Sequence, residues 1–113
     1  MAPHLYLGTC AWSFEAWHGV FYPPNLPAGS RLGWYAKHFG AVEVDSTFYR
    51  IPDPKTVACW REVTPDEFRF CCKVPREITH DLRLRDCGEV MASFLKAIEP
   101  FGEKLGAVLA QLP

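Results

Sequence analysis

The sequence predicts an α/β fold in which four parallel strands alternate with three helices and the sheet curls around an interior, as in a barrel. Two observations lead to this prediction. Short apolar segments alternate with helical patterns, and this order produces a parallel sheet because each helix returns the chain to the same end. In addition, two of the apolar segments alternate with charged residues, so the sheet must have one apolar face and one charged face.

The four predicted strands are the segments 4–10, 41–45, 68–74 and 106–112. The connections that leave their carboxyl ends are longer than those that return from helix to strand, and long loops gathered at one end of a sheet usually carry function. In α/β sheets this is also the end where ligands bind.

Three helical patterns separate the strands. The first covers 30–40 and has apolar residues at i, i+3, i+4 and i+7. The second begins after Asp53, which is predicted as its N-cap, and ends before Pro65. The third is predicted to open at Asp86, with Glu89 three residues later as a capping box.

Charged side chains alternate with apolar ones in the second and third predicted strands. Val42 and Val44 oppose Glu43 and Asp45, whose side chains project the same way, roughly 6–7 Å apart. The apolar face must meet the helices, so the carboxylates are expected to point into the interior. There Lys73 on the neighbouring strand can pair with them, which offsets the cost of burying charge.

Length and composition indicate one partial domain, 1–113, of a globular protein. The net charge of −1 favours neither nucleic acid nor membrane as a partner, and we find no signal peptide or apolar stretch of spanning length, so a cytoplasmic location is expected. The five cysteines are odd in number and lack zinc-binding spacing, which indicates reduced thiols used as small apolar residues.

Four motifs occur in order along the chain: "GTCAWSFEAWHGVFYP", "VEVDSTFYRIP", "FRFCCKVPREITH" and "EKLGAVLAQLP". Together they resemble the YecE-like family, domain of unknown function 72. The resemblance implies a (β/α)8 TIM-type barrel without an established activity. Because such a barrel needs about 250 residues, this chain is expected to be an N-terminal half of one. The chain departs from the family pattern at Asp45, where Asn is usual, and at Ala11, where Gly is usual.

Three residues are predicted to be catalytic: Glu43, Lys73 and His80. Glu43 would be a general base, Lys73 would stabilise a developing anion, and His80 would transfer protons at the mouth. Structural interpretations stand beside these: a buried ion-pair network for the first two residues, and a hydrogen bond that anchors a loop for His80. A metal held by Glu43, Asp45 and His80 would have too few ligands for an ordinary site, so no metal is predicted and the cofactor is left unknown.

The predicted ligand-binding residues come from the loops at the strand ends. Aromatic rings crowd the first loop, where they form either a stacking platform or a small satellite core. Arginines at 50, 76, 83 and 85 make the rim mildly cationic, which suits an anionic ligand but also fits a solvated rim. The predicted binding set is Trp12, Asp45, Ser46, Thr47, Tyr49, Arg76 and Gln111.

Three functional hypotheses follow. In full-length form the protein would be an enzyme, a hydrolase or an isomerase, that acts on a small anionic or sugar-like ligand at the barrel mouth. The alternative is a nucleic-acid-binding or nuclease-like protein that uses the aromatic loop and the basic rim, although the balanced charge argues against it. The chain by itself would be an inactive half-barrel that self-associates through its open sheet edges.

Overall fold

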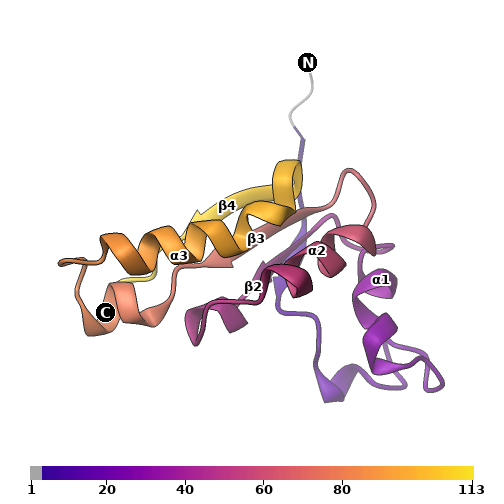
Figure 1. Ribbon diagram of the computed structural model, residues 1–113. Coiled ribbons are helices and arrows are strands. Elements are labelled where there is room, and N and C mark those ends of the chain that lie inside the picture. The colour runs from indigo at the N-terminus through magenta and orange to yellow at the C-terminus, as the bar shows by residue number, and fades with distance from the viewer. Residues whose placement is uncertain (1–3) are drawn as a thin grey trace.

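The computed structural model describes residues 4–113, and its centre is a sheet of four parallel strands in the order β1-β2-β3-β4. The strands span Gly8–Cys10 (β1), Ala41–Val44 (β2), Arg69–Lys73 (β3) and Leu105–Leu109 (β4) (Figure 1). Each overlaps its predicted segment, so the predicted parallel α/β sheet is confirmed. Sequential parallel strands with intervening helices are the layout of half of a (β/α)8 barrel.

The described helices are α1 (Arg31–Tyr35), α2 (Pro54–Glu62) and α3 (Gly88–Ile98). Figure 1 shows α2 and α3 side by side over one face of the sheet. Helix α1 is shorter than the predicted 30–40, because the chain continues beyond Tyr35 as a series of turns.

The predicted caps have different outcomes. Asp53 caps α2 as expected, since its carboxylate accepts a hydrogen bond of 2.9 Å from the backbone N–H of Lys55. The capping box at Asp86 is wrong: α3 has Cys87 at its N-cap position, without a side-chain capping bond. Asp86 has a φ of +46°, in the left-handed region, so its backbone cannot serve as the cap of a right-handed helix.

The core lies between the sheet and the helices. Val42, Val44, Phe70 and Cys72 are almost completely buried on the helix-covered face, as the alternation predicted. They pack with apolar residues of the helices and their connections, among them Leu32, Tyr35, Val57, Phe94, Ile98 and Phe101. The apolar face therefore meets the helices, and the charged residues are left on the opposite face.

Lys104 links the end of α2 to the beginning of β4. Its ammonium group is buried and donates hydrogen bonds to the backbone carbonyls of Arg61, at 2.6 Å, and Thr64, at 2.7 Å. These carbonyls lie at or just beyond the end of the helix, where no further intrahelical N–H group is available to bond them. Burial lowers the pKa of Lys104 from its ordinary value. This lysine is thus a structural clamp, which its position in the sequence did not reveal.

The two edge strands, β1 and β4, leave apolar side chains in contact with solvent. Leu5 and Leu7 before and next to β1, and Val108 and Leu109 on β4, are all at least 40% exposed. Exposed edges of this kind can pair with further strands. Association through these edges stays a prediction.

Candidate functional site

The face of the sheet opposite the helices, here called the inner face, carries a row of polar side chains across three strands. Glu43 of β2 is in register with Cys10 of β1 on one side and with Cys71 of β3 on the other. Lys73 lies two residues further along β3, so its side chain projects from the same face. Parallel strands place their carboxyl ends at one edge, and these residues gather close to that edge.

Glu43 and Lys73 form an ion pair on the inner face. Their Oε1 and Nζ atoms are 3.4 Å apart, and the side chains are 29% and 19% exposed respectively. This partial burial strengthens the attraction relative to a pair in open water. The predicted convergence of the two residues is confirmed, and their catalytic roles stay predictions.

Asp45 and Cys10 extend this charged group. The Asp45 carboxylate lies close enough to the Cys10 thiol to affect its pKa, and Cys10 shares the inner face with Glu43, so Asp45 also faces the interior. The pKa of Cys10 is raised above its ordinary value, first by partial burial and then by the negative charges of Glu43 and Asp45. Sequence reasoning missed Cys10, although its register with Glu43 could have indicated it once β1 was aligned with β2.

His80 and Lys73 both lie close to the aromatic ring of Phe48. The His80 imidazole packs edge-on against Phe48, with ring centroids 5.1 Å apart, and the Lys73 ammonium lies 5.7 Å from the centre of the same ring. The Nδ1 atom of His80 is 2.8 Å from the hydroxyl of Thr79, which orients the imidazole. Phe48 was not among the predicted residues, yet it is the ring that both His80 and Lys73 approach.

Thr47 holds the strand ends together. Its side chain is completely buried, and its hydroxyl lies 3.0 Å from the carbonyl oxygen of Val44 and 2.7 Å from that of Lys73. The hydroxyl is therefore committed to the backbone of two adjacent strands. This position makes Thr47 a support for the site, in place of the ligand-binding role predicted for it.

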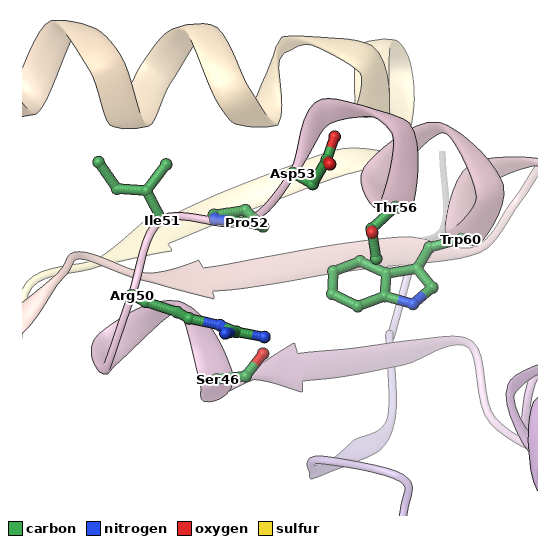
Figure 2. A pocket seen from close by; sticks show the side chains of 7 residues that line it. All are labelled: Ser46, Arg50, Ile51, Pro52, Asp53, Thr56 and Trp60. Atoms are coloured by element: carbon green, nitrogen blue, oxygen red, sulfur yellow. The ribbon is translucent and has the colours of Figure 1, made fainter.

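Trp12 and Ser46 lie on the helix side of the strand ends. The Trp12 ring packs edge-on against Trp60 of α2, at 5.3 Å between centroids, which places it away from the inner face. Ser46 lines a separate cavity beside α2 (Figure 2). The structure thus divides the predicted binding residues between two faces.

The remaining rim residues lie in the second and third mouth loops and beyond β4. Tyr49 is 71% exposed, and it shares a cavity of about 390 Å³ with Arg76. The Arg76 guanidinium is 3.9 Å from the Asp81 carboxylate, which offsets part of the cationic character of the rim. Gln111 follows β4 and is exposed.

The aromatic residues of the first loop pack mainly on one another. Trp17 contacts Phe21 and Tyr22, with centroids 5.6 and 6.0 Å apart, and the buried Tyr22 ring lies under the guanidinium of Arg31. This arrangement is the satellite core that was one of the two interpretations of the loop. Phe14, at 39% exposed, is the ring of this group that is most open to solvent.

Two further observations concern the described part of the chain. Across residues 4–113, no group of three or more His, Cys, Asp and Glu side chains has an arrangement that could hold a metal ion. None of the helices described for these residues combines the length and apolar character that crossing a membrane requires.

The fold and site define a class: an α/β protein with the layout of half of a (β/α)8 barrel and an ion pair near the carboxyl ends of its strands. The chain belongs to the family described as "Protein of unknown function DUF72", whose sequence profile matches residues 6–113. The resemblance noted in the motifs is thereby confirmed.

Relatives and solved structures agree with this assignment. The chain is 37% identical over 109 residues to the UPF0759 protein YecE of Escherichia coli strain K12, and 30% identical over 115 residues to the UPF0759 protein YunF of Bacillus subtilis. The alignments cover 96% of this chain but 38% and 40% of those relatives. The chain therefore spans about two fifths of their length.

Crystal structures of two DUF72 family proteins show the same fold. The protein from Thermotoga maritima superposes with a TM-score of 0.80 at 37% identity, and the one from Enterococcus faecalis with 0.77 at 29%. Each comparison covers 96% of this chain, and 44% and 39% of the respective solved chains.

Proposed function

We propose that the protein is a hydrolase or an isomerase that acts on a small sugar-like ligand with an anionic group, at the carboxyl ends of the strands. The observation that supports the proposal is the Glu43–Lys73 ion pair of 3.4 Å on the inner face. Ionisable groups that are held together in a partly buried site are typical of acid–base catalysis.

In the proposed mechanism Glu43 is the general base. Its carboxylate accepts a proton from a ligand hydroxyl or from a carbon next to a carbonyl, while the ion pair with Lys73 holds the carboxylate in position before the reaction. Once Glu43 has taken the proton, the ammonium group is free to stabilise the negative charge that develops on the ligand. The 3.4 Å separation allows one ligand atom to lie within reach of both side chains.

Recognition of the ligand would be divided between the interior and the rim. Asp45 on the inner face can accept hydrogen bonds from sugar hydroxyls, and Phe48 and Tyr49 offer apolar surface to a sugar ring. Arg76 at the rim would bind the anionic group. To do so, its guanidinium must give up the ion pair with Asp81. His80, against Phe48, would transfer a proton at the mouth.

Activity in this proposal requires more than the described strands. Sites of (β/α)8 enzymes draw residues from several strand ends, and this chain spans about two fifths of its curated relatives. We therefore expect the chain alone to bind ligand weakly and to be inactive. A chimera in which this chain replaces the matching segment of the E. coli relative provides the full length for a test.

The experiment follows a panel of sugar phosphates by phosphorus NMR, which detects both phosphate release and isomerisation. We expect the chimera to convert at least one compound, and Glu43→Gln to abolish conversion although the variant still folds cooperatively. Glu62→Gln, an exposed carboxylate on α2, is the matched control and should remain active. Failure to convert any compound contradicts the proposal. Conversion that persists in a destabilised Glu43→Gln variant would assign the carboxylate a structural role.

A further inference from the structure

A cavity of about 520 Å³ lies between the turn that follows β2 and helix α2 (Figure 2). Its volume is in the range of small-molecule sites. The residues that line it are Ser46, Arg50, Ile51, Pro52, Asp53, Thr56 and Trp60.

The cavity lies on the helix side of the sheet, away from the inner face. Trp60 stacks on Phe101, with centroids 6.2 Å apart, and Phe101 stacks at 4.4 Å on Phe70, which is buried beneath the helices. Glu43 projects to the other side of β2. A ligand in this cavity would therefore be distinct from the ligand of the proposed enzyme, and the inference does not depend on that proposal.

Three polar side chains of the cavity have free hydrogen-bonding capacity. Within residues 4–113, the Arg50 guanidinium makes no ion pair, and the hydroxyls of Ser46 and Thr56 make no hydrogen bond to protein atoms. Figure 2 shows the Arg50 guanidinium extended toward the Ser46 hydroxyl. A guanidinium and a hydroxyl that line the same cavity, both without protein partners, are suited to bind a carboxylate or phosphate oxygen pair.

The opposite side of the cavity is aromatic. The half-buried Trp60 indole is held edge-on by Trp12 at 5.3 Å and from behind by Phe101, so its position is fixed before a ligand arrives. Thr56 and Trp60 also line an adjoining cavity of about 420 Å³, which provides space for a ring that extends past the indole. Flat rings pack favourably against an indole in stacked or edge-on geometry.

Asp53 limits the charge of the ligand. Its carboxylate also lines the cavity, and it already accepts the Lys55 backbone N–H at 2.9 Å. A second negative charge close by would be repelled, which disfavours polyphosphates and favours a single anionic group.

We propose that this cavity is a binding site for a small monoanion in which one carboxylate is joined to a flat ring system, the class of aryl carboxylates. Arg50 and Ser46 bind the carboxylate, and the ring lies against Trp60. Recognition needs both halves of the ligand, because the cationic and the aromatic parts of the cavity are contributed by different elements, the β2–α2 connection and α2 itself.

The test uses 2-naphthoate as probe, followed by calorimetry and by the NMR shift of the Trp60 indole N–H, assigned with the Trp60→Phe variant. A ligand of this size is expected to bind with a Kd of about 1 mM. Arg50→Gln should weaken binding about tenfold, because it removes a charge-assisted hydrogen bond. Arg50 is exposed, so this variant should fold normally.

Four controls, two variants and two ligands, make the result specific. Arg85→Gln removes an exposed arginine outside the cavity, and Glu43→Gln alters the inner face, so both should leave naphthoate binding unchanged. 2-Naphthol, which lacks the carboxylate, and acetate, which lacks the ring, should bind at least tenfold more weakly. The proposal is overturned if naphthoate at about 10 mM leaves the Trp60 signal in place, if naphthol binds equally well, or if Arg85→Gln weakens binding as much as Arg50→Gln.

Discussion

The ion pair between Glu43 and Lys73 should make a measurable contribution to folding. At the observed separation of 3.4 Å, Coulomb's law gives about 1 kcal/mol in water and about 5 kcal/mol at an effective dielectric constant of about 20. The side chains are 29% and 19% exposed, so the environment lies between these limits. Because desolvation offsets part of the attraction, we expect a coupling free energy of about 1–2 kcal/mol.

The assay is a double-mutant cycle measured by urea unfolding of the wild type, Glu43→Gln, Lys73→Met and the double variant. Each single variant leaves a partly buried charge without its partner and should lose stability, while the double variant should lose less than the sum. An exposed pair of substitutions, Glu62→Gln with Lys55→Met, should show a coupling near zero. A coupling below about 0.3 kcal/mol between positions 43 and 73 would refute the inner-face arrangement on which the proposed enzyme depends.

Two further predictions test other parts of the structure. Lys104→Met should destabilise the fold by about 3 kcal/mol, because two backbone carbonyls lose a charged donor, and urea unfolding would measure it. Unfolding midpoints within error of wild type would show that the clamp is dispensable. Asp45→Asn should speed the alkylation of Cys10 by iodoacetamide at pH 8: the Asp45 charge raises the pKa of the thiol, so its removal increases the thiolate fraction. Peptide mass spectrometry reports the rate, with the exposed Cys59 as internal reference. An unchanged rate would show that the Asp45 charge does not affect the Cys10 thiol.

Much of the site could be predicted because strand geometry is local. Glu43 and Lys73 lie on alternating segments, and a side-chain period of two assigns each to the face opposite Val42 and Phe70. The Asp53 cap was predictable for the same reason, since a cap acts within two or three residues of itself. Asp86 shows the limit: its spacing to Glu89 matches a capping box, yet the left-handed backbone at that point excludes it.

The sequence did not indicate which partners the loop side chains contact. Whether Trp12 faces a ligand or a helix depends on Trp60, which is 48 positions later in the chain. The Thr47 hydroxyl likewise donates a hydrogen bond to the backbone carbonyl of Lys73, on a neighbouring strand. Nothing in the spacing of these residues indicates such contacts, because they form only when distant segments pack.

The sequence by itself determined the order of strands and helices and the face on which the charged pair lies, because hydrophobic periodicity sets both over a few residues. Only the tertiary structure decided which mouth residues support the backbone, which share the inner face, and which line the cavity beside α2. The physical reason is that a loop has no periodicity of its own, so its side chains take their directions from whatever the rest of the chain packs against them.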